Sequence, residues 1–431
     1  MGRIIWTCML VLLLTACGSD EPDLGGQRAG EAEPGVRMVE SEVSRVQSPD
    51  VTDEQVADLV QGNNGFAFAM YHEQGGTGNV IFSPYSISLA FSLAYAGARG
   101  ETEAQMAETL KFLPQETQHP AFNAIESRMS GLGEKGGGGD SAPFRLNVAN
   151  SAWGQEGYRF EQAYLETLAG QYGAGLGPVD FGQPDEASEK INAWVADETE
   201  ERIKDLVSPA IITPNTRLVL ANAVYFKASW LSSFEKSNTR EGAFNLPDGD
   251  EATVPLMRQT SYFPYAEGDG YQAVVRLPYK GEAADMLIVL PEEGRFEGIE
   301  GRLSAGFLDE VEEKIRPFEF VKLTMPRFDY ETDLDLIPLL RSMGMTDPFG
   351  GGADIGGITK EEELFIGAAK HRANITVDEK GTEAAAATAL AFPVSEPPPP
   401  VEMTMDRPFL FAITERETGT VLFLGRVTDP S

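Results

Sequence analysis

The sequence predicts an α+β fold with large antiparallel sheets, and two observations lead to this class. Apolar residues recur at helical spacing before about residue 110, whereas the later chain consists mainly of β-branched and aromatic runs. These runs do not alternate regularly with helical segments, so the β–α–β rhythm of a parallel-sheet protein is missing. A hydrophobic fraction of 42% with 23% charged residues is typical of a folded globular chain.

The first elements are helices. Thr52 is the predicted N-cap of a helix that the Asn63-Asn64-Gly65 sequence interrupts. Ser83-Pro84 opens a second helix, because proline is favourable in a first turn. Thr102 and Gln105 have the spacing of a capping box, which predicts a third helix.

Strands dominate the later chain, with one amphipathic helix expected over 185–207. The run TRLVLANAVYFKASW at 216–230 is long and apolar, which is typical of a strand in the middle of a large sheet. Glu415–Gly419 is the expected turn of a closing hairpin. The other predicted strands are 144–153, 271–277, 284–290, 318–328, 363–377, 408–415 and 420–427.

Composition excludes several functions. The net charge of −33 disfavours nucleic acid or an anionic membrane surface as a partner. The only cysteines are Cys8 and Cys17, so the folded part holds no disulfide, thiolate zinc site or cysteine nucleophile. With three histidines and no hydrolase, Walker or dinucleotide-binding motif, we expect no enzyme activity, no cofactor and no metal site.

The N-terminus indicates export. Residues 1–16 have the basic start and short apolar run of a secretory signal peptide, too short to span a bilayer. Leu14-Thr15-Ala16-Cys17 resembles a bacterial lipobox, which implies lipidation of Cys17 and anchoring to a bacterial membrane; Gly18 favours the outer membrane, with the cell surface or exterior as the other possibility. An ordinary signal peptide with an incidental Cys17 is the alternative. The polar residues 17–50 predict a disordered acidic tether, and 51–431 the folded domain.

The segment between the last strands is unusual. Residues 378–391, DEKGTEAAAATALA, are rich in alanine and taken alone predict a helix. They follow a strand-like run, however, and continue into FPVSEPPPP at 392–400, which favours an extended chain. A long loop inside a compact domain is usually functional or disordered.

Five segments carry recognisable motifs in a fixed order: NVIFSPYSI (79–87), NAVYFKASW (222–230), DEKGTEAA (378–385), RPFLF (407–411) and GRVTDP (425–430). Together they resemble the serpins, a family of metastable serine protease inhibitors. The resemblance covers about residues 52–431 and implies three sheets, eight or nine helices and an exposed reactive loop near the C-terminus.

The resemblance also implies a suicide mechanism, in which a protease forms an acyl-enzyme with the loop and the loop then inserts as a strand into the main sheet. The partner is therefore a serine protease held covalently by a monomeric inhibitor. The implied hinge consists of Glu379, Gly381, Thr382, Glu383, Ala384, Ala385, Ala386 and Ala387.

The loop sequence meets the requirements of an inserted strand. If Thr382 points inward, every second residue through Leu390 does so too, and all of these are small or apolar. Glu383 falls on the outward set. No proline precedes Pro393, so each earlier backbone N–H can join a central sheet, and Gly381 gives the hinge freedom to bend.

Two adjacent bonds are candidates for cleavage. Counting by resemblance places the bond at Ser395–Glu396, but Val394–Ser395 is favoured because proline followed by a small aliphatic residue resembles what elastase-like proteases accept. Subtilisin-like and chymotrypsin-like proteases are further expected targets. Nothing basic lies between Lys380 and Arg407, which argues against trypsin-like targets.

The resemblance also implies two clusters that hold the main sheet closed. The shutter, under the centre of the sheet, consists of Ser83, Ser86, Asn222 and His371. The breach, where the loop first enters, consists of Trp230, Arg327 and Glu379. We expect Arg327 and Glu379 to form an ion pair there, which as an exposed pair would contribute about 0–1 kcal/mol but would resist premature opening.

Two other functions remain open from the sequence. A serpin fold can serve a non-inhibitory binding or chaperone-like protein, although such proteins often carry bulky, charged or proline residues in the hinge. Cross-class inhibition of a cysteine protease is the second alternative, since the loop sequence does not distinguish it.

Overall fold

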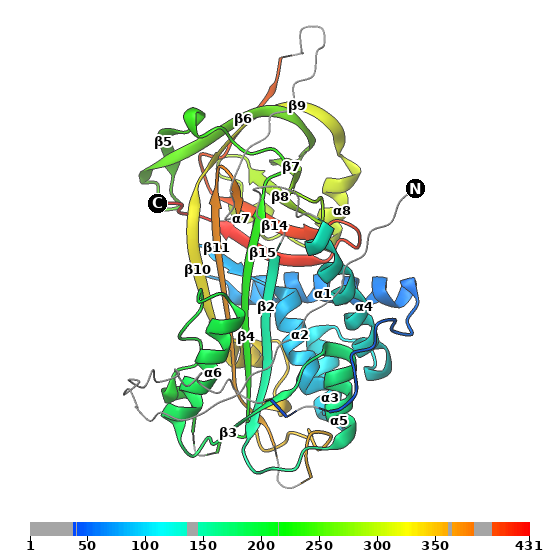
Figure 1. The fold of residues 1–431 in the computed structure, drawn as a ribbon. Helices are drawn as coiled ribbons and strands as arrows, with labels where there is room; N and C mark the ends of the chain where they lie inside the picture. The colour runs from blue at the N-terminus through cyan, green and yellow to red at the C-terminus, as the bar shows by residue number, and fades with distance from the viewer. Residues whose placement is uncertain (1–37, 40, 136–144, 214, 361–363, 383–398) are drawn as a thin grey trace, which may run out of the picture. The chain divides into compact units, whose positions relative to one another are not determined.

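The computed structural model describes residues 38–39, 41–135, 145–213, 215–360, 364–382 and 399–431 (Figure 1). Within these residues the chain is α+β, as predicted, with nine α-helices. They are α1 (Asp53–Gln74), α2 (Pro84–Tyr95), α3 (Gly100–Leu110), α4 (Gln115–Lys135), α5 (Gln162–Thr167), α6 (Pro184–Glu198), α7 (Phe296–Glu300), α8 (Ala305–Glu313) and α9 (Leu336–Ser342).

Six strands form one sheet, called the main sheet below, in the order β10-β11-β12-β4-β2-β3. Strands β11 and β4 also pair directly with each other in parallel, so the short β12 separates them only at one end. The strands are β2 (Arg145–Gln155), β3 (Leu176–Val179), β4 (Leu218–Ser229), β10 (Phe328–Asp335), β11 (Ile366–Asp378) and β12 (Gly381–Thr382).

Nine further strands are connected through the long β6. The first part of β6 pairs with β5 and β9, and its last residues pair with β7, so β6 joins two sheet portions. The order is β1-β15-β14-β8-β7-β6-β9-β13, with β5 on β6. The strands are β1 (Val80–Phe82), β5 (Arg240–Asn245), β6 (Glu251–Gly268), β7 (Tyr271–Pro278), β8 (Ala284–Pro291), β9 (Arg316–Pro326), β13 (Val401–Thr404), β14 (Phe409–Glu415) and β15 (Val421–Val427).

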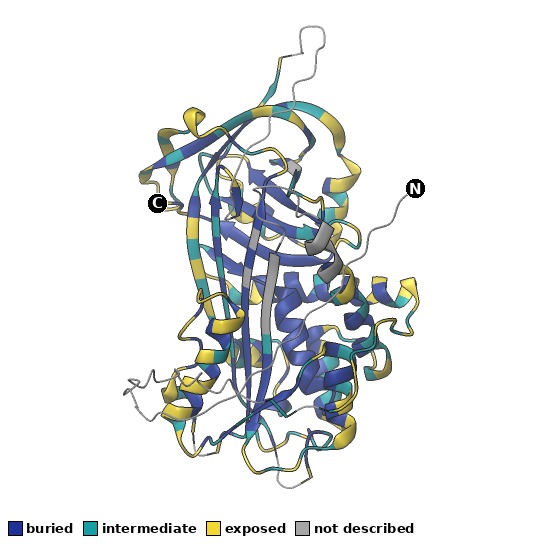
Figure 2. Ribbon diagram, viewed as in Figure 1, coloured by how far each residue is buried: buried dark blue, intermediate teal, exposed yellow. Residues whose placement is uncertain are grey.

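Strand β4 is buried on both faces, which explains its long apolar run (Figure 2). Residues of one parity, such as Leu220 and Val224, belong to the large core that contains α2. Residues of the other parity, such as Val219 and Ala223, pack in a second cluster with α6. This alternation follows from the two-residue period of a strand.

The folded domain begins earlier than the sequence predicts. Val39 forms a two-way backbone bridge with Leu176 of β3, with N–O distances of 2.8 and 3.0 Å. Arg45 donates to Asn123 at 3.0 Å and pairs with Glu126 at 2.8 Å. The predicted tether over 17–50 is therefore too long at its C-terminal end, because Val39 already pairs with β3 and Arg45 already contacts α4. The predicted signal peptide and Cys17 lie outside the described residues.

Two other boundaries differ from the prediction. The helix expected over 185–207 ends at Glu198, because Glu200 and Glu201 adopt positive φ angles of 51° and 62° that no helix accommodates. The strand expected over 318–328 is two strands in different sheets, β9 and β10, with Arg327 between them bonded to Pro255 O at 3.0 Å.

Candidate functional site

The predicted reactive loop connects β12 of the main sheet with β13, which pairs with β9 in the other sheet. Of its predicted functional residues, Glu379, Gly381 and Thr382 are described. Both candidate bonds and the hinge residues from Glu383 onward lie outside the described residues: Glu383, Ala384, Ala385, Ala386, Ala387, Val394, Ser395 and Glu396.

The first two residues of the loop already lie inside the sheet. Gly381 pairs with Ser229 of β4 and with Asp378 of β11, and Thr382 pairs with Ala228 on the same side. Gly381 has φ of 145°, and a Cβ atom there would meet the carbonyl oxygen of Ala228 at 2.2 Å. Glycine is therefore required by both the backbone angle and the close approach.

Thr382 points inward, which is the direction assumed above for the inserted strand. It is buried, and its hydroxyl lies 3.0 Å from the hydroxyl of Tyr279. This contact fixes the parity of the strand that the loop would continue, because side chains alternate between faces.

The breach residues meet as predicted, but the ion pair is not exposed. The side chain of Glu379 is 6% exposed and accepts from Arg327 Nε at 2.9 Å and from Thr239 Oγ1 at 2.5 Å. Its backbone carbonyl accepts from Phe234 N at 2.8 Å. Burial raises the pKa of Glu379, but the hydrogen bonds from Arg327 and Thr239 outweigh it and hold the pKa below its usual value. The estimate for an exposed pair therefore does not apply.

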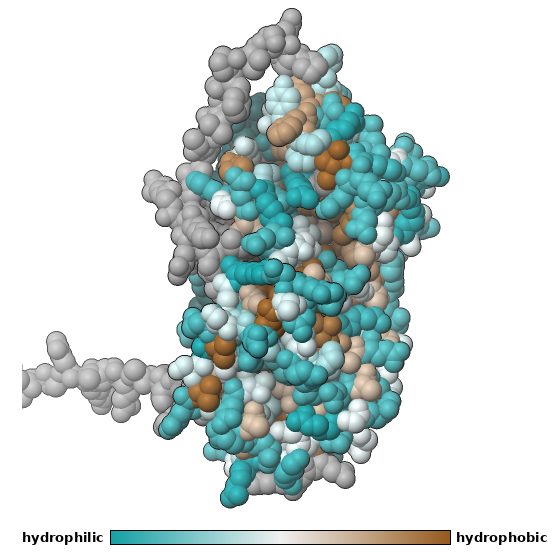
Figure 3. All heavy atoms as spheres, turned by 90° about the vertical axis from the view of Figure 1, so that its right-hand side faces the viewer, coloured by the Kyte–Doolittle hydropathy of each residue, from teal (hydrophilic) through white to brown (hydrophobic). Residues whose placement is uncertain are grey.

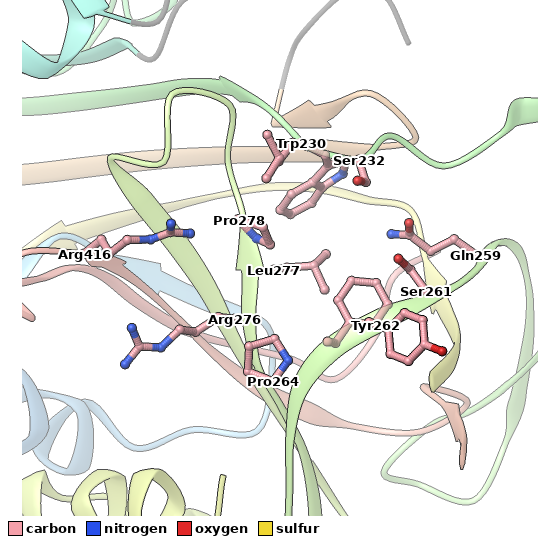
Figure 4. A pocket seen from close by; sticks show the side chains of 12 residues that line it. Trp230, Ser232, Gln259, Ser261, Tyr262, Pro264, Arg276, Leu277, Pro278 and Arg416 are labelled. Carbon is pink, nitrogen blue, oxygen red and sulfur yellow. The ribbon is translucent and has the colours of Figure 1, made fainter. Parts of the chain in front are cut away.

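Trp230 ties the hinge to the top of β4. Its indole N–H donates to the carbonyl of Asp378 at 3.0 Å, and its ring stacks on Tyr279 at 4.6 Å with an interplanar angle of 12°. The indole also borders a cleft of about 300 Å³. Figure 4 shows Trp230 at this cleft together with Leu277 of β7 and Gln259 of β6. Trp230 thus connects Asp378, the last residue of β11, with Tyr279, which directly follows β7.

The shutter residues also meet, beneath the centre of the main sheet. The hydroxyl of Ser83 caps α2 by accepting from Ser86 N at 3.1 Å. Asn222 donates to the carbonyl of Ser86 at 2.8 Å and to its hydroxyl at 2.6 Å. His371 of β11 bonds to the Asn222 side chain through Nδ1 and to Ser83 N through Nε2, the latter at 3.1 Å.

This network assigns the protonation state of His371. The backbone N–H of Ser83 can only donate, so Nε2 must accept and carry no proton. The amide nitrogen of Asn222 donates to Ser86, so its oxygen accepts from Nδ1–H. The imidazole is therefore neutral, and burial lowers the pKa of His371 to about 3.

Sequence reasoning missed Asn150 in the shutter. Asn150 lies opposite Asn222 on β2, accepts a hydrogen bond from it, and donates to the carbonyl of Ser86 at 3.1 Å. The only signal in the sequence is an asparagine inside a predicted strand, a position that this residue type usually avoids.

The arrangement of the main sheet, the hinge and the two polar clusters is that of a protein whose sheet can open to admit a further strand. Two central parallel strands are separated at one end by a hinge, and polar clusters lie at that end and beneath the sheet centre. Such a sheet can accept the loop as a further strand without losing its outer pairings.

Comparison with known proteins agrees with this class. The family model described as Serpin (serine protease inhibitor) matches residues 61–430. An uncharacterised serpin-like protein of the archaeon Thermococcus kodakarensis is 42% identical over 382 residues, which cover 87% of each chain. The leukocyte elastase inhibitor of Equus caballus is 35% identical over 384 residues, 86% of this chain and 99% of that protein.

A solved structure matches the fold. The thermophilic serpin tengpin in its native state superposes with a TM-score of 0.79 at 24% identity, covering 90% of this chain and 97% of that one. The chain belongs to the serpin family, whose members are generally protease inhibitors.

Proposed function

We propose that this protein inhibits serine proteases by cleavage of its reactive loop and insertion of that loop into the main sheet. It acts as a stoichiometric inhibitor and a monomer, without enzyme activity or cofactor. The observation that supports the proposal is the register of β12, which, if continued along the sheet, would bring the loop to the shutter.

The register follows from two sets of pairings. Gly381 and Thr382 pair with Ser229 and Ala228 of β4, so each further loop residue advances one residue toward the start of β4. Continued to residue 388, this register pairs Thr388 with Asn222. The β11 pairings, Val377 with Thr382 and Asp378 with Gly381, independently pair residue 388 with His371.

Thr388 has the parity of Thr382 and would face inward, between the two side chains that hold the shutter closed. A threonine hydroxyl both donates and accepts, so it can replace the hydrogen bond that Asn222 and His371 lose when the strands separate. Insertion then exchanges one satisfied polar cluster for another, which removes a large penalty for opening the sheet.

The chemistry preceding insertion is that of the protease. Its serine Oγ attacks the carbonyl carbon of the residue before the cut, the bond to the following nitrogen breaks, and that nitrogen leaves as the new amine of the C-terminal fragment. The loop stays esterified to the serine. Insertion of the loop pulls this ester away from the catalytic histidine before water can hydrolyse it.

We place the cut at Val394–Ser395 and assign elastase-like proteases as the main targets, with subtilisin-like and chymotrypsin-like enzymes as further ones. The similarity to the leukocyte elastase inhibitor supports this class. Valine is a small apolar residue, and proline at 393 precedes it.

A denaturing gel tests the proposal. The full chain with Cys17→Ser is incubated with pancreatic elastase and with subtilisin, and an inhibitor yields a complex that survives SDS. Mass analysis of the released fragment identifies the bond by whether it starts at Ser395 or at Glu396. Complete cleavage without an SDS-stable band across a broad protease panel would contradict inhibition and favour a non-inhibitory role. A band with papain would reveal inhibition of cysteine proteases.

We also propose that the protein is exported and attached to a bacterial membrane, with the outer membrane favoured, through lipid on Cys17. The lipobox supports this, and among the described residues no helix is long and apolar enough to cross a membrane. Metabolic labelling with a radioactive fatty acid should mark the wild-type chain and not Cys17→Ser. Equal labelling of both would contradict the anchor.

A further inference from the structure

Exposed aromatic side chains gather on one face of β6 and β9. We call Tyr262, Phe318 and Phe320 the aromatic patch. Phe318 is 85% exposed, the highest value for a large apolar side chain among the described residues, and Tyr262 is 50% exposed. Figure 2 shows buried, intermediate and exposed residues alternating along the β6–β9 arch, and Figure 3 shows apolar residues near the upper end of a neighbouring face. An apolar cluster that stays in water on a soluble domain indicates a binding surface.

The three side chains form one continuous surface. Tyr262 and Phe320 are direct cross-strand partners, and their rings lie 5.1 Å apart at 41°. Phe318 lies two residues before Phe320 and therefore on the same side of β9. Their common face is opposite to the buried face that carries Phe263 and Val321.

The patch adjoins the exit of the reactive loop. Strand β13 runs parallel to β9, with Val401 beside Val321 and Glu402 beside Lys322. The same register continued backward brings the chain before Val401 alongside Phe320. The Val394–Ser395 bond lies six residues before Val401, so it is at most about 20 Å away along the chain.

A protease is large enough to cover both places. A compact chain of about 230 residues has a radius of gyration of about 18 Å. When such an enzyme holds the scissile bond in its cleft, the surface beside its primed subsites extends over the loop exit and reaches the patch.

Two basic residues beside the patch are paired. Lys322 bonds to Glu402 at 2.8 Å, and Arg316 bonds to Glu319 at 3.1 Å. Docking against the patch therefore does not leave these two cations without a partner. A second copy of this chain is disfavoured as the occupant, because both copies carry a net charge of −33.

We propose that the aromatic patch is a second contact surface for the target protease, which packs an apolar area beside its active-site cleft against Phe318 and Tyr262. The proposal rests on the proposed inhibitory function. The patch strengthens the encounter complex and takes no part in loop insertion, because it lies outside the main sheet.

The test compares the parent with the double variant Phe318→Ala/Tyr262→Ala, all in the full chain with Cys17→Ser. Two controls are matched. Phe318→Tyr keeps the ring, and Val43→Ala removes an exposed apolar side chain of the N-terminal segment, which lies beside Gly170 and not on β6 or β9. Thermal unfolding confirms that each variant folds. The association rate constant and the stoichiometry of inhibition are measured with pancreatic elastase and subtilisin at low and high salt.

We expect the double variant to associate about tenfold more slowly with at least one protease, at both salt concentrations and with unchanged stoichiometry, because aromatic anchors dominate interfaces. Both controls should match the parent. Unchanged association with both enzymes, or a change confined to stoichiometry, overturns the proposal. Binding to the same proteases with the catalytic serine replaced by alanine separates the two hypotheses, since it needs no cleavage. If the parent forms no covalent complex with the active protease, the inhibitory function is contradicted. If the double variant binds the inactive protease as tightly as the parent does, the aromatic patch is not a contact surface.

Discussion

The neutral state of His371 makes the stability of this protein depend on pH in a direction that can be worked out. In the unfolded chain a histidine has a pKa near 6.5, whereas in the shutter burial lowers the pKa of His371 to about 3. Between these values the unfolded chain binds the proton and the folded protein does not. Stability from this group is therefore complete above pH 6.5 and is lost as the pH falls below it.

The size of the loss can be estimated. For any folded pKa well below 5, lowering the pH to about 5 costs about 2 kcal/mol per buried neutral histidine. His119 adds a similar amount, because burial and, to a smaller extent, Arg99 lower its pKa to about 4. We expect the two histidines together to account for a loss of about 4 kcal/mol of unfolding free energy between about pH 7.5 and about pH 5.

Urea unfolding at these two pH values tests the reasoning. His371→Gln removes one titrating group, so over the same interval this variant should lose about 2 kcal/mol less than the parent, although it is less stable at every pH. His119→Gln is the matched control and should show the same reduction. The difference between variants cancels the contribution of the carboxylates. A loss in His371→Gln as large as that of the parent would refute the assigned neutral imidazole.

Three further predictions concern the breach and the loop. Arg327→Ala should lower the unfolding free energy by about 1–3 kcal/mol, because it leaves the buried Glu379 carboxylate without its cation. If thermal unfolding shows that the effects of Arg327→Ala and Glu379→Gln simply add in the double variant, the two residues do not interact. Ala386→Pro lacks the N–H that a central strand needs and should be cleaved without forming an SDS-stable complex, whereas Ala386→Ser should still inhibit; a stable complex with the proline variant would exclude insertion. Val394→Arg should create a trypsin inhibitor, measured by residual trypsin activity, and the same gain from Ser395→Arg instead would move the bond by one residue.

The hinge could be predicted from the sequence because its constraints are local. The freedom to bend expected of Gly381 follows from its place between two strands, and its φ of 145° is an angle that glycine readily adopts. Strand alternation predicts which loop residues share the face of Thr382, and the structure adds that this face is the buried one. The family motifs also located the shutter and breach residues that the structure brings together.

Predictions of where helices begin or break were wrong at residues whose hydrogen-bond partners are distant in the sequence. The predicted break at Asn63-Asn64-Gly65 is wrong, since α1 runs through it. Asn63 donates to Val421 O at 3.1 Å, and Asn64 donates to Gly419 O at 3.0 Å. These tertiary bonds outweigh the low helix propensity of asparagine.

The capping box at Thr102 and Gln105 is also wrong. Helix α3 begins earlier, at Gly100, so neither residue is an N-cap. Thr102 Oγ1 instead accepts from Asp354 N at 2.8 Å, and Gln105 Oε1 accepts from Thr346 N at 2.9 Å. The two side chains thus accept hydrogen bonds from the backbone of a segment about 250 residues later in the chain. A local sequence pattern cannot predict such contacts. The same limit applies to the burial of Glu379, because Thr239 and Phe234 come from another part of the chain.

The bridge between Val39 and Leu176 fixes where the N-terminal segment leaves the domain, and so how much space a captured protease would have in an anchored inhibitor. Leu176 pairs with Ala152, and Ala152 pairs with Leu220 of β4. The register of β12 would bring Leu390 of an inserted loop opposite Leu220, so the captured enzyme would arrive at the end of the domain where the chain departs toward Cys17. The twenty residues from 18 to 37 span at most about 70 Å. A compact protease of about 230 residues is about 45 Å across. If the inhibitor is anchored at Cys17, the segment between the lipid and the domain must therefore be at least long enough for the protease to fit between the domain and the membrane.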